Sequence, residues 1–145
     1  MGDEFVLSIK GGEELGRLKI LGPEGAKFTA PSLEVTVGRI SGSRYTMRSN
    51  EDEILSAKPT ETSAEKLEIR CGGRDYTATV SLFRNRAVVR DESGVEVARL
   101  KGNVTGRTYK IETATENPCI LPVTVLLLYH TAFRRRRAYR ALGKR

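Results

Sequence analysis

The sequence predicts a mainly β fold that closes with one hydrophobic helix. Three observations carry this prediction: short runs rich in β-branched and aromatic residues recur along 1–117, turn residues separate them, and a long stretch without charge follows. About eleven runs are spaced by roughly the 8 to 12 residues typical of a sandwich or a barrel. Strands and helices do not alternate, which disfavours the nucleotide-binding α/β folds. We therefore expect one domain over 1–145, with strands in 1–117 and a hydrophobic, then basic helix in 118–142.

Turn residues bound the first six runs. Gly11-Gly12, the segment GPEG at 22–25 and Pro31 end the first three runs, and Ser41-Gly42-Ser43 predicts a hairpin turn. The polar segment 59–63 is the best candidate for a loop. The expected strands are 5–10, 17–21, 26–30, 33–37, 44–48 and 54–58, of which 33–37 alternates apolar and polar residues with period two.

Five more runs follow the same pattern. Gly72-Gly73 separates the first two of them, Arg84-Asn85 is a plausible tight turn, and the segment DESG at 91–94 predicts another turn. The expected strands are 66–71, 76–83, 87–90, 95–100 and 107–113.

The segment 118–133 contains no formal charge and predicts a helix. Pro122 suits the first turn, where its missing N–H costs nothing, and Gly143 is a natural stop after the helix has continued through the following arginines. Its apolar residues do not keep to one stripe, so the helix must be buried on all sides, in lipid or in protein.

Both environments fit such a helix. Sixteen uncharged residues span about 24 Å, short of the ~30 Å hydrocarbon core of a bilayer. The arginines that follow nevertheless have the form of a stop-transfer flank, so a short tail anchor is one alternative. About eleven strands closed around the helix would hide it without lipid and remove exposed strand edges. The strand count favours this closed antiparallel barrel of about 11–12 short strands with a central, buried helix.

Three phrases carry a resemblance to a known family: the strand, acidic-glycine turn and strand at 88–100, the segment 106–111, and the closing run LPVTVLLL at 121–128. With the many short strands and the final helix, they make the chain resemble the tubby C-terminal superfamily, which includes phospholipid scramblases and LURP-one-related proteins. The resemblance covers nearly the whole chain. It implies a closed antiparallel barrel of about twelve strands around a central helix. In tubby-type members the implied ligand is anionic membrane lipid, often phosphoinositide. No stretch matches the tubby phosphoinositide site or a calcium segment residue by residue, so neither site is carried over.

The net charge of +7 comes entirely from the basic tail, residues 134–145, because the first 133 residues balance. On a helix, Arg134, Arg135, Arg136, Arg137 and Arg140 would point around nearly the full circumference. Guanidinium groups match phosphate oxygens bidentately, so these five arginines are the candidate lipid or polyanion site. Nucleic acid is a weaker rival, because there is no Trp and no stacking platform of aromatic residues.

Other polar residues give weaker signals. His130, the single histidine, lies within the apolar segment and is interpreted as a hydrogen-bonded core residue. No nucleophile–base pair, phosphate loop or metal-binding spacing is present, so we nominate no catalytic residue, metal site or cofactor. Cys71 and Cys119 are interpreted as small buried hydrophobes.

Two further charged groups have structural interpretations. Arg39, Arg44 and Arg48 bracket the predicted turn at 41–43 and could form a second basic patch, although ordinary surface pairing is the favoured interpretation. The acidic segment 51–53 lacks the alternation of a calcium loop and is interpreted as solvated.

We therefore expect a non-enzymatic, monomeric binding module that docks on anionic membrane lipid. Asp3 and Glu4 stand where a secretory signal would be basic, so the expected location is cytoplasmic and peripheral to the membrane. The alternatives are a structural or protein-interaction barrel without a lipid ligand, and the short tail-anchored protein.

Overall fold

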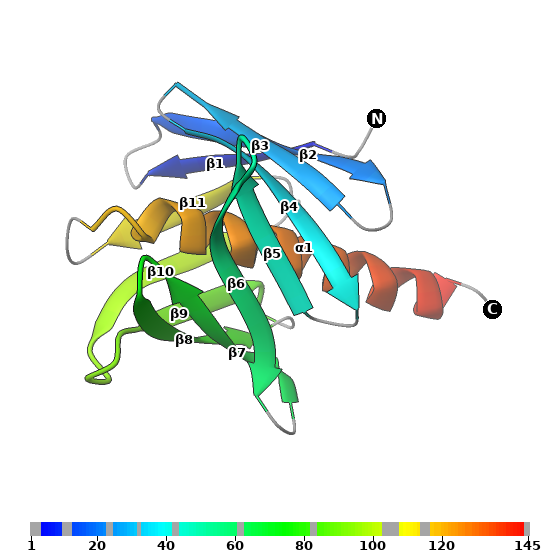
Figure 1. Cartoon of the computed structure of the whole chain (residues 1–145). Coiled ribbons are helices and arrows are strands. Elements are labelled where there is room, and N and C mark those ends of the chain that lie inside the picture. The colour runs from blue at the N-terminus through cyan, green and yellow to red at the C-terminus, as the bar shows by residue number, and fades with distance from the viewer. Residues whose placement is uncertain are drawn as a thin grey trace.

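Eleven strands close into a single barrel around one helix in the described part of the chain (Figure 1). The structure, a computed structural model, describes residues 4–9, 13–22, 25–31, 33–41, 44–60, 63–81, 84–102, 108–113 and 117–143, without the side chains of 41, 63, 64 and 135–143. The elements in chain order are β1 (Glu4–Ile9), β2 (Glu14–Gly22), β3 (Gly25–Ala30), β4 (Leu33–Ser41), β5 (Arg44–Ser49), β6 (Asp52–Thr60), β7 (Ser63–Cys71), β8 (Arg74–Ser81), β9 (Arg86–Arg90), β10 (Glu96–Gly102), β11 (Thr108–Thr113) and α1 (Ile120–Gly143).

The strands follow one another around the barrel as an up-and-down meander. Consecutive strands pair antiparallel, and β1 closes the barrel against β11, with Val6 opposite Thr108 and Ile9 opposite Ile111. This last pairing is parallel, whereas the sequence predicted antiparallel pairing throughout. The reason is parity: in a meander with an odd number of strands, the first and the last strand run in the same direction.

The expected polar loop at 59–63 is largely strand. Pro59 and Thr60 belong to β6, and Ser63 begins β7. The register between β6 and β7 shifts between Pro59 and Thr60. A proline fits beside such an irregularity because it cannot donate to a regular hydrogen-bond ladder. This is why a turn-forming residue lies here within a strand.

Alternating inward side chains and the helix together fill the barrel. Along β8, for example, Tyr76, Ala78 and Val80 are buried and the residues between them are exposed. Every side chain of α1 from Pro122 to Ala132 is buried, and the helix contacts β5, β8, β10 and β11. The prediction of a helix enclosed by strands is therefore confirmed.

Among the described residues, no helix combines the length and the apolar character that crossing a bilayer requires.

The barrel has two different ends, which we name by the helix. At the cap end α1 begins, and the turns β1–β2, β3–β4, β5–β6, β7–β8 and β9–β10 lie there. At the tail end α1 leaves the barrel toward the basic tail. The hairpins β2–β3, β4–β5, β6–β7, β8–β9 and β10–β11 share this end with the start of β1 (Figure 1).

A cap and a disulfide hold the helix at the cap end. The Asn117 side-chain oxygen accepts a hydrogen bond of 2.8 Å from the Cys119 N–H, and the Asn117 amide donates to the Tyr76 hydroxyl at 3.0 Å. Cys119 is joined to Cys71 at the end of β7 by a disulfide. The interpretation of the two cysteines as separate small hydrophobes is therefore wrong. Both are buried, but no short spacing in the sequence brings them together, because the fold alone carries the helix start to the β7–β8 turn.

A buried polar contact closes part of the tail end. Asn85, in the predicted turn before β9, has a φ of 56°, and its side-chain oxygen accepts a 2.9 Å hydrogen bond from the Tyr109 hydroxyl. Gly102 packs directly against this pair: a Cβ there would lie 2.0 Å from Asn85 Nδ2. Only glycine fits at this position without displacing the contact.

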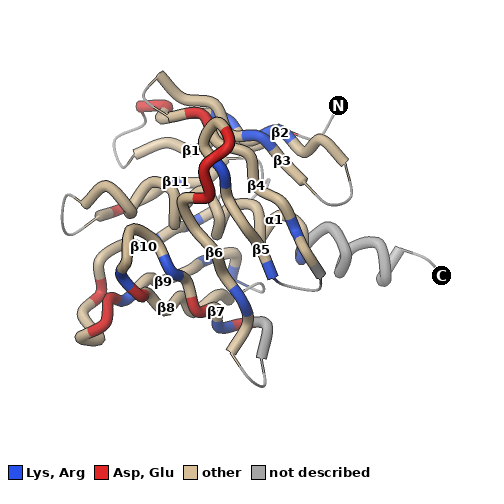
Figure 2. Tube along the Cα trace, in the orientation of Figure 1, with Lys and Arg blue, Asp and Glu red and all other residues tan. Residues whose placement is uncertain are grey.

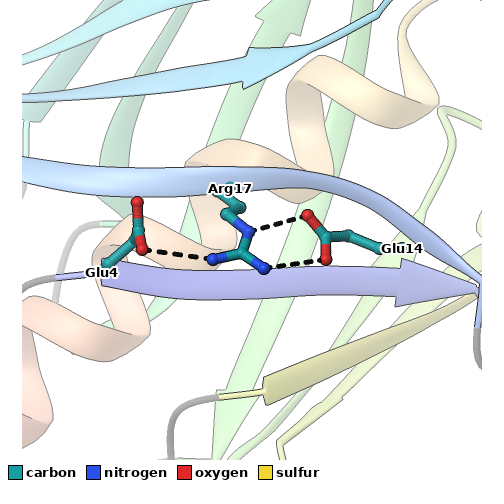
Figure 3. A network of polar contacts seen from close by, with 3 residues as sticks. All are labelled: Glu4, Glu14 and Arg17. Atoms are coloured by element: carbon teal, nitrogen blue, oxygen red, sulfur yellow. Dashed lines mark hydrogen bonds and ion pairs between the residues drawn. The ribbon is translucent and has the colours of Figure 1, made fainter.

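Ion pairs tie neighbouring strands together on the outer face. Figure 3 shows Arg17 of β2 between two carboxylates, donating to Glu14 at 2.8 and 3.1 Å and to Glu4 of β1 at 3.3 Å. The hydrogen bond from Arg17, aided by its charge, lowers the pKa of Glu14 below its ordinary value, although exposed pairs of this kind stabilise a fold only weakly.

Candidate functional site

An aromatic cluster formed by α1 and β5 lies where the helix leaves the barrel. Tyr45 of β5 contacts the rings of Tyr129 and His130 edge to face, with centroids 5.7 and 5.5 Å away. The Tyr129 ring lies 6.2 Å from that of Phe133, one turn further along α1. These rings pack between α1 and β5 at the tail end and hold α1 in place just before the basic tail begins.

His130 belongs to this cluster as a core residue, as predicted. Its side chain is fully buried, and its Nδ1 shares a hydrogen bond of 2.6 Å with the Tyr45 hydroxyl. When the neutral ring carries its proton on Nε2, the tyrosine donates and Nδ1 accepts. This arrangement satisfies a buried imidazole and presents no base to solvent.

Arginines border the cluster at the tail end. The Arg39 guanidinium carbon lies 4.6 Å from the centroid of the Phe133 ring, within the range of a cation–π contact. Arg134 follows Phe133 and is half-buried. Of the five predicted site residues, Arg134 alone has a described side chain. The side chains of Arg135, Arg136, Arg137 and Arg140 lie outside the described residues, although their backbone continues α1.

Basic residues collect around the same end of the barrel. In the three tail-end residues of each strand, in the turns there and at the point where α1 leaves, cations outnumber carboxylates. The cations described there are Lys27, which forms an ion pair with Glu34, and Arg39, Arg44, Lys58, Arg84, Arg86, Lys101, Lys110 and Arg134. The carboxylates described at this end are Glu4, which is bonded to Arg17, and Glu65.

The cap end has the opposite charge. By the same measure its carboxylates are Glu13, Glu14, Glu34, Glu51, Asp52, Glu53, Asp75, Asp91, Glu92, Glu96 and Glu112. Its described cations are Arg48, Arg70, Arg74 and Arg90. Figure 2 shows acidic positions at the β5–β6 and β9–β10 turns, and basic positions at the ends of β4, β5 and β6 near the departing helix. The barrel is therefore electrically polarised along the axis of α1.

The structure separates the three arginines around the β4–β5 hairpin. Arg39 points toward the helix and contacts Phe133, and Arg44 is exposed at the tail end. Arg48 lies near the cap end, where it donates to the Glu51 carbonyl at 3.5 Å. These three residues do not form a patch of their own. Arg39 and Arg44 instead join the larger basic end.

A hollow of about 610 Å³ crosses the outer face from β5 to β8. Its lining includes Arg44 and Lys58 from the basic end, but also Glu68 and the pair Arg70–Asp75, whose charged atoms are 2.6 Å apart. Because the hollow contains charges of both signs, we do not assign the anion site to it. The open basic end is the better candidate.

Sequence reasoning found the basic tail but missed the basic residues of the barrel. Lys58, Arg84, Arg86 and Lys101 are scattered along the chain, and none of them belongs to a contiguous basic run like that of the tail. The usable signal was positional: these residues all flank alternate hairpins, which lie at one end of any meander.

Comparison with protein-family models, curated proteins and solved structures finds no match to this chain.

Proposed function

We propose that this chain is a non-enzymatic binding module that docks its tail end on anionic membrane lipid. The observation that carries the proposal is the charge polarity of the barrel, with basic residues gathered where the arginine-rich segment leaves. An anionic surface would attract the tail end and repel the cap end. The module would therefore approach a membrane in one orientation.

The size of each electrostatic contribution favours binding by many basic residues together over binding at a single site. Each basic residue near an anionic membrane adds on the order of 1 kcal/mol, within a Debye length of about 8 Å at physiological salt. Arg44, Lys58 and Arg86 are exposed at the tail end and would act together with the tail. A purely solubilising tail would need no matching charge on the barrel, so this polarity favours docking over the alternative of a barrel without a lipid ligand.

The proposal includes the family and the location. A closed barrel around a helix is the general architecture that the resemblance to the tubby, scramblase and LURP-one-related superfamily implies, although this barrel has eleven strands and a parallel closure instead of about twelve antiparallel strands. We propose membership in this superfamily. We also propose that the module is cytoplasmic, monomeric and without a cofactor, and that it binds peripherally to the anionic inner leaflet.

The test is co-sedimentation with vesicles. We expect the protein to bind phosphatidylcholine vesicles that contain phosphatidylserine or phosphoinositide, not phosphatidylcholine alone, and we expect high salt to weaken this binding. Arg44→Gln, Lys58→Gln and Arg86→Gln together should weaken binding by roughly tenfold or more, by removing three favourable charges.

The matched control removes the same charge from the other end. Arg48→Gln, Arg74→Gln and Arg90→Gln together leave the same net charge but alter the cap end, so they should bind nearly as the unmodified protein does. Equal loss in both triple variants would show attraction by net charge without orientation. Protein that ignores every vesicle would rule out lipid docking and favour the protein-interaction barrel.

A further inference from the structure

Two large hydrophobic side chains are exposed at the basic tail end. Leu21, near the end of β2, is 60% exposed, and Ile40, near the end of β4, is 65% exposed. Both precede hairpins beside the point where α1 emerges (Figure 1). Leucine and isoleucine in these positions contribute nothing to the core.

The two side chains lie on the same part of the outer surface. β2 pairs with β3 and β3 with β4, and Gly22, Gly25 and Gly38 are neighbours across these three strands. Ile40 therefore lies about two residues, roughly 7 Å, nearer the tail end than Leu21, on strands two apart, so the two residues are on the order of 12 Å from each other. Each also sits where the register shifts, between Ile20 and Gly22 in one strand and between Arg39 and Ser41 in the other. Such bulges re-aim side chains at the rim of a barrel.

Their surroundings identify the partner by its chemistry. Arg44 pairs with Ser41 directly beside Ile40, and Lys27, which forms an ion pair of 3.0 Å with Glu34, lies on β3 between the two strands. Apolar side chains beside cations match the interface of an anionic bilayer, where phosphates lie next to the acyl boundary. Val95, the other large exposed hydrophobic residue described, is 58% exposed but lies at the cap end beside Asp91 and Glu92. It lacks this combination.

We propose that Leu21 and Ile40 insert into the acyl boundary of an anionic membrane when the tail end docks. This inference rests on the proposed function and deepens it: the charges bring the barrel to the surface, and the two side chains hold it there with the axis of α1 steeply inclined to the membrane. Binding then has a component that salt does not remove.

The absence of Trp from the sequence allows a direct test. Leu21→Trp, Ile40→Trp and Val95→Trp each introduce a single fluorophore at an exposed position. With vesicles of phosphatidylcholine and phosphatidylserine, the emission of the Leu21→Trp and Ile40→Trp proteins should move to shorter wavelength and be quenched by lipids with brominated acyl chains. The Val95→Trp protein, the matched control, should bind equally but show neither change.

A second set of variants measures the contribution to binding. Leu21→Ser with Ile40→Ser keeps every charge and should weaken partitioning on the order of tenfold, because partly burying two such side chains stabilises the bound state. Val95→Ser should leave partitioning unchanged.

The outcomes separate the two proposals. If none of the proteins sediments with anionic vesicles, the proposed function fails. If all bind but the three fluorophores stay in water, docking is purely electrostatic and the insertion is overturned. If the unmodified protein self-associates without lipid and Leu21→Ser with Ile40→Ser abolishes this, the patch is an interface between copies and the insertion is likewise overturned.

Discussion

Glu14 and Arg17 show how local geometry sets the titration of an exposed carboxylate. Arg17 donates to both oxygens of Glu14 and also reaches Glu4 across the β1–β2 pair. Glu96 and Arg99 repeat the arrangement on β10, and in both cases the arginine hydrogen bond is the main cause of a lowered carboxyl pKa. A carboxylate with a lowered pKa stabilises the fold above its unfolded-state pKa, and this contribution is lost as pH falls through the folded-state pKa.

Replacing Arg17 with Gln should raise the pKa of Glu14 toward its ordinary value of 4.5. The reason is that the main hydrogen-bond donor to the charged carboxylate is gone. Side-chain carboxyl carbon shifts, followed by NMR between neutral pH and acid, measure the midpoint. Glu96 is the internal control, because its partner Arg99 is untouched. An unchanged Glu14 midpoint would contradict the pairing.

At the scale of elements, α1 is held at both of its barrel ends by different means. The disulfide and the Asn117 cap fix its start, and the Tyr45–His130 bond and the Arg39–Phe133 contact fix the point where it leaves. The charged tail therefore projects from a fixed position on the barrel. This is what a docking surface composed of both tail and strand ends requires.

Reduction of the disulfide should lower the free energy of unfolding by about 4 kcal/mol, because the link joins residues 48 positions apart and restricts the unfolded chain. Denaturant unfolding with and without dithiothreitol measures the loss. The double variant Cys71→Ala with Cys119→Ala should be indifferent to the reductant. Two reactive thiols in unfolded protein that was never reduced would contradict the link. Thiol trapping in cells would also test the cytoplasmic location, where disulfides are rare.

Most elements could be predicted from the sequence, because their signals are local. All eleven expected runs correspond to strands, and α1 begins and ends within two residues of the expected positions. β2, β4, β6 and β7 extend further than expected because polar residues, glycine and proline near their ends do not interrupt strand pairing. The turn signal at Pro59 was misleading because the proline lies within β6, beside the shift in register between β6 and β7.

The site could be predicted only in part, because most of it is assembled by the fold. The arginines of the tail are contiguous, so their charge is visible in the sequence. Lys58, Arg84 and Lys101 meet only through the meander, which carries alternate hairpins to one end. The Cys71–Cys119 link depends on the helix returning through the barrel, a long-range event without a local signature.

At the scale of the whole molecule, barrel and helix share one core and should unfold together. Leu126 is fully buried in α1, whereas Leu21 is exposed on β2. Leu126→Ala should therefore lower the free energy of unfolding by about 3 kcal/mol, and Leu21→Ala by less than about 0.5 kcal/mol. Denaturant unfolding followed by circular dichroism measures these free energies of unfolding. Native-state hydrogen exchange should show that amides of α1 and of the strands open with the same free energy. Helix amides that open well before the strands would contradict a shared core.

The parallel seam between β1 and β11 also orders events in time. It joins parts of the chain such as Ser8 and Tyr109, which are 101 positions apart and share a hydrogen bond of 3.4 Å. Closing so long a loop is entropically costly and slow. Because α1 follows β11 in the chain yet lies inside the barrel, the helix must find its place before or while the seam closes. β1 therefore cannot complete its pairing with β11 until α1, which follows both strands in the chain, is in place. Until then the edges of β1 and β11 are open to pairing with other chains.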